Sequence, residues 1–450
     1  MTNRGAIPAR TAAGPLLSRD MIATAVVAFS FFLICAAYFR AGASADLRAM
    51  WLAGRALAEG HPELVYPVDG SYFTMQPPPE WLTRLTAEGY SGEVFPYLYP
   101  PLWAWLMSLI AGAVPFEVIQ ALASVLNPVL LVALVLTAYR LAAPGLAPAH
   151  YLAAAMSVLL LSAIGSMALL QNQPQILVAF LTVLAIERSE HGHEVAGGAL
   201  LALAAALKIL PAVFVLLLLA SGRRRAVWSF FATGGALGLL SIAVAGWPLH
   251  QHFLQLLGVI SDTAMLSPMI YSWESVIAQS LFPDLQHLII ARPVNPVEKI
   301  LYGWTVVQKP FAFSLACKLA QAGALVALAF RFRAMRSTAE RALLWPAAFG
   351  VMSLLGPIAW CYHYLAMAAF TPCLIDRLGL RRGMALLTVA VILTSPWLAS
   401  RLMQGQFFEF DPSRLRQALG TLTMTGLTLA FLLAPPCPPA EATPSTDVSP

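Results

Sequence analysis

Long apolar stretches alternate with polar segments along the chain, and many of them are about as long as a bilayer-spanning helix. The first covers residues 21–39, and the others lie at about residues 101–114, 118–139, 151–170, 175–186, 195–220, 226–245, 311–330, 343–359, 364–375, 384–400 and 419–434. A hydrocarbon core about 30 Å thick needs roughly 20 helical residues. The pattern therefore predicts an all-α, polytopic membrane helix bundle with about 11–13 transmembrane helices, several of them short.

Two long polar segments, residues 40–99 and 246–309, interrupt this pattern. The first carries seven acidic residues and four arginines, and prolines divide it into short pieces. Its apolar spacing predicts one interfacial helix over residues 47–59 and a second over residues 80–88. Because loops poor in positive charge face the outside, the first segment is expected to be an outer loop, and alternation between the arginine clusters described below places the second segment outside as well. Residues 435–450 are rich in Pro, Ala, Ser and Thr and predict a disordered tail.

Arginine clusters predict which ends of the spans face the cytoplasm. Basic residues gather in residues 1–20, before the first span, and again at residues 223–225, 331–341 and 377–382. Cytoplasmic loops carry an excess of lysine and arginine. We therefore expect a cytoplasmic N-terminal segment over residues 1–20, followed by one transmembrane domain over residues 21–434.

Two points of this topology stay open. Residues 43–45 (Ala-Ser-Ala) look like a signal-peptide cleavage site, although the apolar stretch before them is long for a signal peptide, which favours an uncleaved helix. Between residues 100 and 223, strict alternation would place Arg140 outside. Residues 195–220 contain a break, so they either cross the membrane once or dip in and return.

Composition agrees with a membrane protein and excludes several other classes. The chain is 59% hydrophobic and only 11% charged, which is too few charges for a soluble protein of 450 residues. Its net charge of +5 is explained by the arginine clusters and does not indicate a nucleic-acid partner. The five cysteines form no CxxC pair, and no phosphate-binding glycine loop, GxSxG elbow or HExxH helix is present.

Asp46 is the first acidic residue after the first span, at the outer boundary of the membrane and just before a predicted helix. One interpretation is an N-cap, because aspartate is favoured there and its charge complements the helix dipole. The other is a general base held at the interface. The two roles are compatible.

Other polar residues interrupt apolar stretches, where they need partners or a function. Gln171 and Gln173 flank Asn172 between two apolar stretches. This segment is either a surface loop or a pair of broken helix ends that line protein or water. Lys208 lies deep in an apolar run, where it either snorkels to an interface or binds an anion such as phosphate. His363 is either an interfacial anchor or a ligand on the same side as Asp46.

Aromatic residues and prolines mark the entries to two of the stretches. Tyr99, Pro100 and Pro101 open the second stretch, and Trp360 precedes the turn that carries His363. An interfacial aromatic belt explains such a pattern. The alternative is a rigid wall for a sugar or a lipid chain.

Taken in order along the chain, these landmarks resemble those of glycosyltransferase family 87. They are the early aspartate, the Tyr-Pro-Pro entry, the amide segment, the Lys-x-x-Pro break and the late Trp-x-x-His turn, at Asp46 and residues 99–101, 171–173, 208–211 and 360–363. The resemblance implies a GT-C-like fold in the plasma membrane and an active site on the extracytoplasmic side. It also implies a cell-envelope enzyme that moves a hexose, with mannose favoured, from a polyprenyl phosphate to a glycolipid or glycan acceptor.

The resemblance also implies roles for single residues. Asp46 would be the general base. The donor phosphate would be bound by Lys208, His363, Gln171 and Gln173, and the substrate cavity would be lined by Trp51, Tyr99, Pro100, Pro101 and Trp360. No metal or other cofactor is expected. Direct displacement would invert the anomeric carbon, and a two-step route is the open alternative. Family members often show Asn-Gln-Ser in the second outer loop, whereas residues 271–275 here read Tyr-Ser-Trp-Glu-Ser, so a different acceptor is open.

Two other classes of protein compete with this prediction. A lipid-linked glycan ligase or polymerase would carry its arginine- and histidine-rich chemistry in a late outer loop, whereas here the key acid comes early. A lipid or solute transporter would show two related halves with matched broken helices. The loop that carries Asp46 has no counterpart in the second half of the chain.

Overall fold

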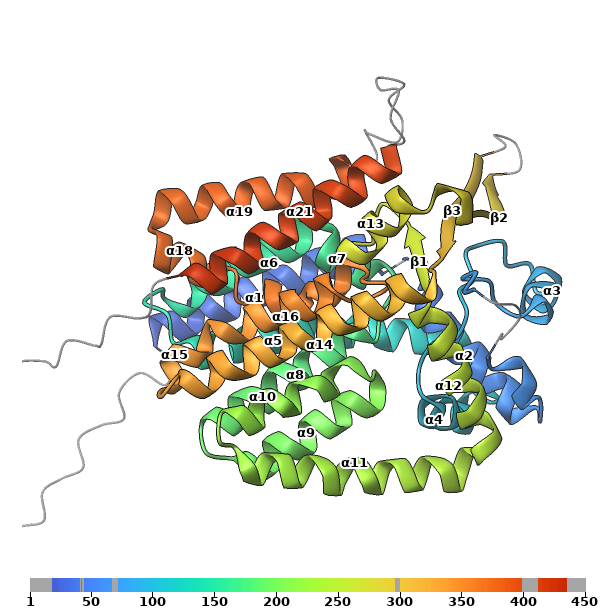
Figure 1. The fold of residues 1–450 in the computed structure, drawn as a ribbon, viewed down its shortest axis with the longest axis horizontal. Coiled ribbons are helices and arrows are strands. Elements are labelled where there is room, and N and C mark those ends of the chain that lie inside the picture. The colour runs from blue at the N-terminus through green and yellow to red at the C-terminus, as the bar shows by residue number, and fades with distance from the viewer. Residues whose placement is uncertain are drawn as a thin grey trace, which may run out of the picture.

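The computed structural model describes residues 18–40, 42, 44–66, 72–295, 300–398 and 412–434. Most of the predicted N-terminal segment and the predicted tail at residues 435–450 lie outside this range. The described chain is mainly helical. Figure 1 shows the longer helices side by side along one direction, with a group of short helices and strands at one end.

The body of the bundle is formed by helices from all parts of the described chain. They are α1 (Arg19–Tyr38), α5 (Phe116–Ala142), α6 (Pro148–Leu161), α7 (Ala163–Leu170), α8 (Gln175–Glu190), α9 (Glu194–Leu207), α10 (Phe214–Ala220), α11 (Arg224–Ala245), α14 (Phe311–Ala334), α16 (Leu344–Leu354), α18 (Pro372–Leu378), α19 (Leu380–Thr394) and α21 (Pro412–Leu433). Short pieces connect some of them: η2 (Leu210–Val213), α15 (Thr338–Ala342), η4 (Cys361–Tyr364) and α17 (Leu365–Ala368). Their apolar side chains form one large core.

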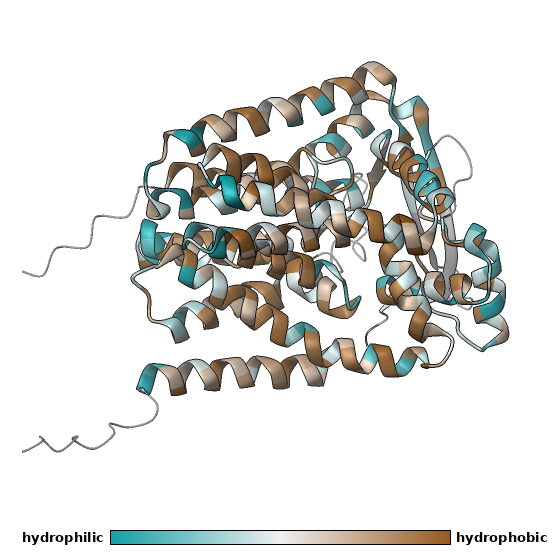
Figure 2. Cartoon of the chain, turned by 90° about the horizontal axis from the view of Figure 1, so that it is seen from below, coloured by the Kyte–Doolittle hydropathy of each residue, from teal (hydrophilic) through white to brown (hydrophobic). Residues whose placement is uncertain are grey.

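Four of these helices, α1, α5, α11 and α14, are long and apolar enough to cross a membrane. A fifth span results if α6 and α7, which meet at 69°, count as one. Figure 2 shows an apolar middle between two hydrophilic ends, which is the pattern that a bilayer requires. The predicted all-α membrane bundle is confirmed. The estimate of about 11–13 spans counted every apolar stretch, and several of those in the described chain form helices too short to cross alone.

Arginines and two buried glutamates gather at one end of the bundle, called here the arginine end. Glu190 at the end of α8 pairs with Arg341 at 2.6 Å and with Arg223 at 2.8 Å. Arg140, at the end of α5, lies 3.5 Å from Glu187 on the same turn of α8. Arg140 therefore lies with the other arginines, not at the opposite end where strict alternation would place it.

The segment predicted to cross once or to return does return. The start of α9 and the start of α11 meet at the arginine end, where a Glu194 carboxylate oxygen accepts from the backbone N–H of Arg225 at 3.0 Å. Between them α9 rises into the bundle, the chain breaks at Lys208, and α10 leads back. Residues 195–220 are thus a broken hairpin, and Lys208 lies at its tip.

The opposite end, called here the loop end, consists of both long polar segments. The helices predicted over residues 47–59 and 80–88 are α2 (Ala45–Ala58) and α3 (Pro79–Ala87), joined by η1 (Pro62–Leu64) and followed by α4 (Pro101–Ala111). The second segment forms α12 (Trp247–Ser261), α13 (Trp273–Leu281), η3 (Pro283–Leu285) and the strands β1 (Thr263–Leu266), β2 (Gln286–Asn295) and β3 (Ile300–Gln308).

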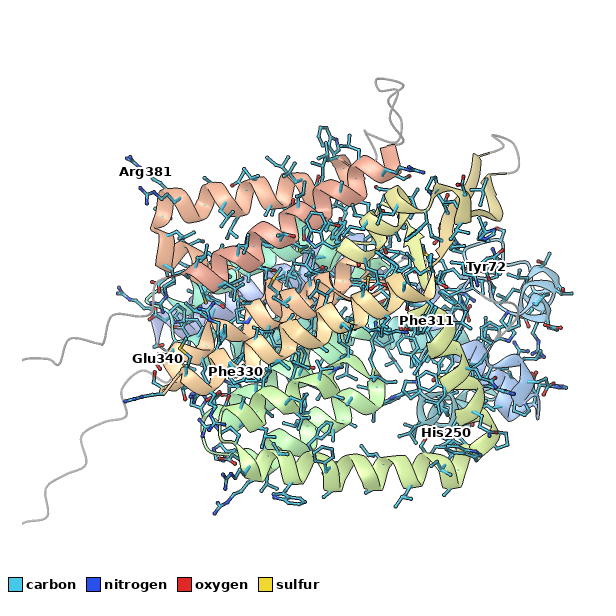
Figure 3. All side chains as sticks on the ribbon, in the orientation of Figure 1. Tyr72, His250, Phe311, Phe330, Glu340 and Arg381 are labelled. Carbon is cyan, nitrogen blue, oxygen red and sulfur yellow. The ribbon has the colours of Figure 1, made fainter. Side chains whose placement is uncertain are left out.

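The strands form an antiparallel sheet in the order β1-β3-β2, which the sequence analysis did not predict. Thr263 pairs with Gln308, so the sheet depends on contacts between residues far apart in sequence. Local periodicity gives little information about such pairing. Figure 3 shows the two ends of the molecule: Tyr72 lies at the loop end, whereas Glu340 and Arg381 lie at the arginine end.

Candidate active site

Asp46 lies in the first turn of α2, at the loop end of the bundle. The N-cap position belongs to Ser44, so the N-cap interpretation of Asp46 is wrong. The Asp46 side chain is half-buried, and its Oδ2 atom is inaccessible to water and has no hydrogen-bond partner among the described residues. A carboxylate oxygen with no partner inside a protein is costly, and such groups are concentrated at functional sites.

The amide segment between α7 and α8 holds the backbone that leads into Asp46. The backbone N–H of Ala45 donates to Oε1 of Gln171 at 2.8 Å, and the N–H of Ser44 donates to the carbonyl of Leu170 at 3.1 Å. Nδ2 of Asn172 donates to the Ser44 hydroxyl at 2.9 Å. The start of α2 is thereby fixed to the end of α7, more than a hundred residues away in sequence.

Helix α5 supports this junction with a polar face that the sequence analysis missed. The Asn127 amide donates to Oδ1 of Asn172 at 2.9 Å, and the Gln120 amide donates to the Ser44 hydroxyl at 3.1 Å. Gln120, Ser124 and Asn127 follow an i, i+4, i+7 spacing within an apolar helix. That spacing places the three side chains on one side of the helix, and it is the sequence pattern from which this polar face could have been predicted.

Gln173 connects the amide segment to the aromatic residues of the loop end. The Tyr99 hydroxyl donates to Oε1 of Gln173 at 2.6 Å, and the Tyr66 hydroxyl donates to the Tyr99 carbonyl at 2.6 Å. The Gln173 side chain also interacts with Tyr362, where it opposes the larger rise in the pKa of this tyrosine that burial causes. Three tyrosines from separate parts of the chain therefore share one buried network.

Lys208 and His363 meet in this region although 155 residues separate them in sequence. The Lys208 ammonium donates to Nε2 of His363 at 2.7 Å and lies 5.6 Å from the centre of the Tyr362 ring. The tip of the broken hairpin is held in place by the indole N–H of Trp103, which donates to the carbonyl of Ala206 at 2.8 Å. Both Lys208 and His363 are half-buried, so each remains partly accessible.

The electrostatic environment brings the pKa of the Asp46 carboxyl close to neutral pH. Burial raises the pKa of Asp46 from 3.8 to about 7, while the charge of Lys208 lowers it and that of Glu93 raises it. The pKa of Glu93 is itself raised, because the effect of burial is larger than the opposing effect of Gln171. Glu93 is a site residue that the sequence analysis missed, and nothing in its local pattern distinguishes it from the other acids of the loop.

The geometry therefore combines a half-buried carboxyl, a lysine and a histidine at the loop end of a membrane bundle. The sequence model of glycosyltransferase family 87 matches residues 97–357, which is more than half of the chain. The chain belongs to glycosyltransferase family 87. No curated protein matches it.

The span shared with family 87 contains only part of the site. Tyr99, the amide segment and Lys208 lie inside the matched residues 97–357. Asp46 precedes them and His363 follows them. The structure, and not the match, therefore associates this acid and this histidine with the residues of the matched span.

Three residues predicted to line the substrate cavity of the transferase have structural contacts. The indole N–H of Trp51 donates to the carbonyl of Val114 at 3.3 Å, and its ring packs edge-on against Phe116 in the apolar cluster that also contains Tyr99. Pro101 begins α4, and the carbonyl of Pro100 accepts from the Tyr97 hydroxyl at 2.7 Å. These contacts give each of the three residues a structural role, and their place in the substrate cavity stays a prediction.

Trp360, in contrast, borders the site. Its ring stacks on Tyr362 with 6.2 Å between ring centres, and its backbone forms a β-bridge with Ile270 in the second polar segment. The backbone N–H of Cys361 donates to the carbonyl of Met269 at 2.7 Å. The turn that carries His363 is thus tied to the second polar segment.

Two cavities open at the loop end of the transferase, with volumes of about 440 and 220 Å³. Neither is lined by Asp46, Lys208 or His363. Among the described residues, no group of three or more His, Cys, Asp or Glu side chains could hold a metal ion.

Proposed function

We propose that this membrane glycosyltransferase moves a hexose, with mannose favoured, from a polyprenyl monophosphate to a hydroxyl of a glycolipid or glycan. The observation that carries the proposal is the Asp46 carboxyl, whose Oδ2 has no partner in the described structure and whose pKa is about 7. A general base works best when its pKa lies near the operating pH. Asp46 is therefore the group assigned to deprotonate the acceptor.

In the proposed reaction the acceptor oxygen attacks the anomeric carbon of the donor sugar. The bond from that carbon to the acceptor oxygen forms, the bond to the phosphate oxygen breaks, and the phosphate leaves with the electron pair. The acceptor proton passes to Asp46. This single displacement inverts the anomeric carbon, and the lipid monophosphate is released.

The departing phosphate needs positive charge, which the Lys208 ammonium supplies, and its contact with His363 supports a role for both side chains. Cationic groups placed where negative charge develops are among the strongest contributions to catalysis. Gln171 and Gln173 accept hydrogen bonds from Ala45 and Tyr99. We assign these two amides mainly to positioning the site, and donor binding to Lys208 and His363.

The two ends of the bundle support an orientation in the plasma membrane. The site residues 171–173 precede α8, and Glu190 ends it, so about 24 Å of helix separates them at 1.5 Å per residue. Arginine-rich ends face the cytoplasm. The site would then face the extracytoplasmic side, where a polyprenyl donor can present its sugar while its tail stays in the bilayer.

A donor screen tests this function. The full-length protein, reconstituted in lipid, is supplied with polyprenyl monophosphates of mannose, glucose and arabinose and with nucleotide sugars as the comparison. Mass spectrometry then detects the transfer of sugar to a mixture of glycan acceptors. We expect transfer from a polyprenyl monophosphate only. Transfer from nucleotide sugars alone would refute the proposed donor, and transfer of a preassembled glycan from a lipid diphosphate would favour the ligase alternative.

A further inference from the structure

The cavity of about 440 Å³ at the loop end has no role in the proposed chemistry. It lies between residues 63–66 and 72–80 on one side and helix α12 on the other, and its polar and aromatic lining includes Glu63, Tyr66, Tyr72, Thr74, Gln76 and Glu80. Its volume lies within the usual range for small-molecule sites, about 300–1,000 Å³. Figure 3 shows Tyr72 at the far end of the molecule from Glu340 and Arg381.

The wall of this cavity is preformed by hydrogen bonds between the two polar segments. The backbone N–H of Phe73 donates to the Thr263 hydroxyl at 2.9 Å, and the indole N–H of Trp304 donates to the carbonyl of Thr74 at 3.0 Å. The ring of Tyr72 stacks on His287 with 4.4 Å between ring centres and 5° between planes. A wall fixed in this way loses little conformational entropy when a ligand binds.

The chemistry of the lining fits a neutral, polyhydroxylated ligand. The carboxylates of Glu63 and Glu80 and the carbonyl of Gln76 accept hydrogen bonds from hydroxyl groups, and Tyr72 offers an aromatic face for the apolar side of a sugar ring. The described lining contains no lysine or arginine. A phosphate would be repelled by the two carboxylates, so the lining disfavours the charged end of the donor.

The cavity is joined to the site by two consecutive hydrogen bonds. Tyr66 lines the cavity and donates to the carbonyl of Tyr99, and Tyr99 in turn donates to Gln173 in the amide segment. The side chain of Tyr66 is only 4% exposed, so this connection is buried and well defined. A glycan in the cavity would therefore lie next to the network that surrounds the reacting groups.

From these observations we infer that the cavity binds the glycan part of the acceptor, beyond the sugar whose hydroxyl reacts. This inference rests on the proposed function. It assigns the donor phosphate and the acceptor glycan to different places: the phosphate to Lys208 and His363, and the glycan to the acidic, aromatic cavity at the loop end.

Variants of the cavity test the assignment through the acceptor KM. Tyr72→Ala and Glu80→Gln should each raise the acceptor KM about tenfold, equivalent to about 1.4 kcal/mol, and leave kcat and the donor KM unchanged. The matched control is Glu88→Gln. Glu88 directly follows α3, the helix that contains Glu80, but it lines neither cavity. An unchanged acceptor KM in both cavity variants, in an enzyme with normal turnover, would overturn the inference.

A binding measurement separates this inference from the proposed function. Saturation-transfer NMR on the full-length protein uses α-linked mannobiose and maltotriose as probes and inorganic phosphate as the competitor. Binding that is lost in Tyr72→Ala, kept in Glu88→Gln and unaffected by phosphate supports the glycan site even if no polyprenyl donor is used. Absence of binding to the unaltered protein, or displacement by phosphate, counts against it. The melting temperature of each variant identifies any loss of folding.

Discussion

The substitution Asp46→Asn should abolish most turnover and at the same time stabilise the fold. Asparagine has the same shape as the protonated aspartic acid but cannot accept the acceptor's proton. Loss of a general base lowers the rate by about 10² to 10⁴-fold. The stabilisation follows from the raised pKa of the Asp46 carboxyl in the folded protein, because its charged form is disfavoured there.

The size of the stabilisation follows from the pKa shift and from pH. The pKa of Asp46 rises from 3.8 to about 7 on folding. Each pKa unit corresponds to about 1.4 kcal/mol, so the charged carboxylate costs the fold up to about 4 kcal/mol above pH 7. Asp46 as a whole residue is only half-buried and the charge of Lys208 partly compensates the carboxylate, which reduces the expected gain to about 1–2 kcal/mol. Below pH 3.8 the carboxyl is protonated in both states, and the gain disappears.

Two assays on the same protein measure both effects. Turnover is measured with the polyprenyl donor found in the screen, and thermal unfolding is followed by tryptophan fluorescence at pH 4 and pH 8. Glu59→Gln is the control, because its effect on stability should have the opposite sign. Pairing with Arg84 lowers the pKa of Glu59, so this variant should have a slightly lower melting temperature at pH 8. Turnover within threefold of the unaltered enzyme would refute the general-base assignment. No gain in melting temperature at pH 8 would refute the raised pKa of Asp46.

Three further predictions concern pH, donor binding and the arginine end. Because the base must be ionised and the pKa of Asp46 is about 7, kcat/KM should rise about tenfold between pH 6 and pH 8; a flat profile would contradict this. Lys208→Met should shift that rise in kcat/KM to higher pH, since Lys208 lowers the pKa of Asp46, and it should increase the donor KM. Lys208→Arg should leave the pH profile and the donor KM unchanged. Initial rates measured against donor concentration and pH test both variants. Glu190→Ala leaves Arg223 and Arg341 without their buried partner and should cost about 3–5 kcal/mol of unfolding free energy in thermal unfolding, with unchanged kcat in the folded enzyme.

The local features of the site were predictable because they depend on neighbouring residues. The helix α2 agrees with the prediction over residues 47–59 to within two residues, since its apolar spacing is a local property. Asp46 was found from its place after an apolar stretch. Lys208 was found because a charge inside an apolar run needs an explanation.

The partners of these residues could not be predicted in the same way. Glu93 raises the pKa of Asp46, and Gln173 interacts with Tyr362, yet neither Glu93 nor Tyr362 stands out in its own segment. The return of residues 195–220 to the arginine end also follows from a contact between distant residues, the one between Glu194 and the backbone of Arg225. Charge counting alone left that segment open.

The sequence by itself determined that the chain is a membrane helix bundle of a glycosyltransferase family, and it indicated which polar residues require an explanation. Hydropathy and charge are sums over neighbouring residues, so they can be read directly from the chain. Only the tertiary structure decided that Lys208 meets His363, that Ser44 and not Asp46 caps α2, and that the second polar segment forms a sheet. Those outcomes depend on the packing of segments far apart in sequence, for which local periodicity carries no information.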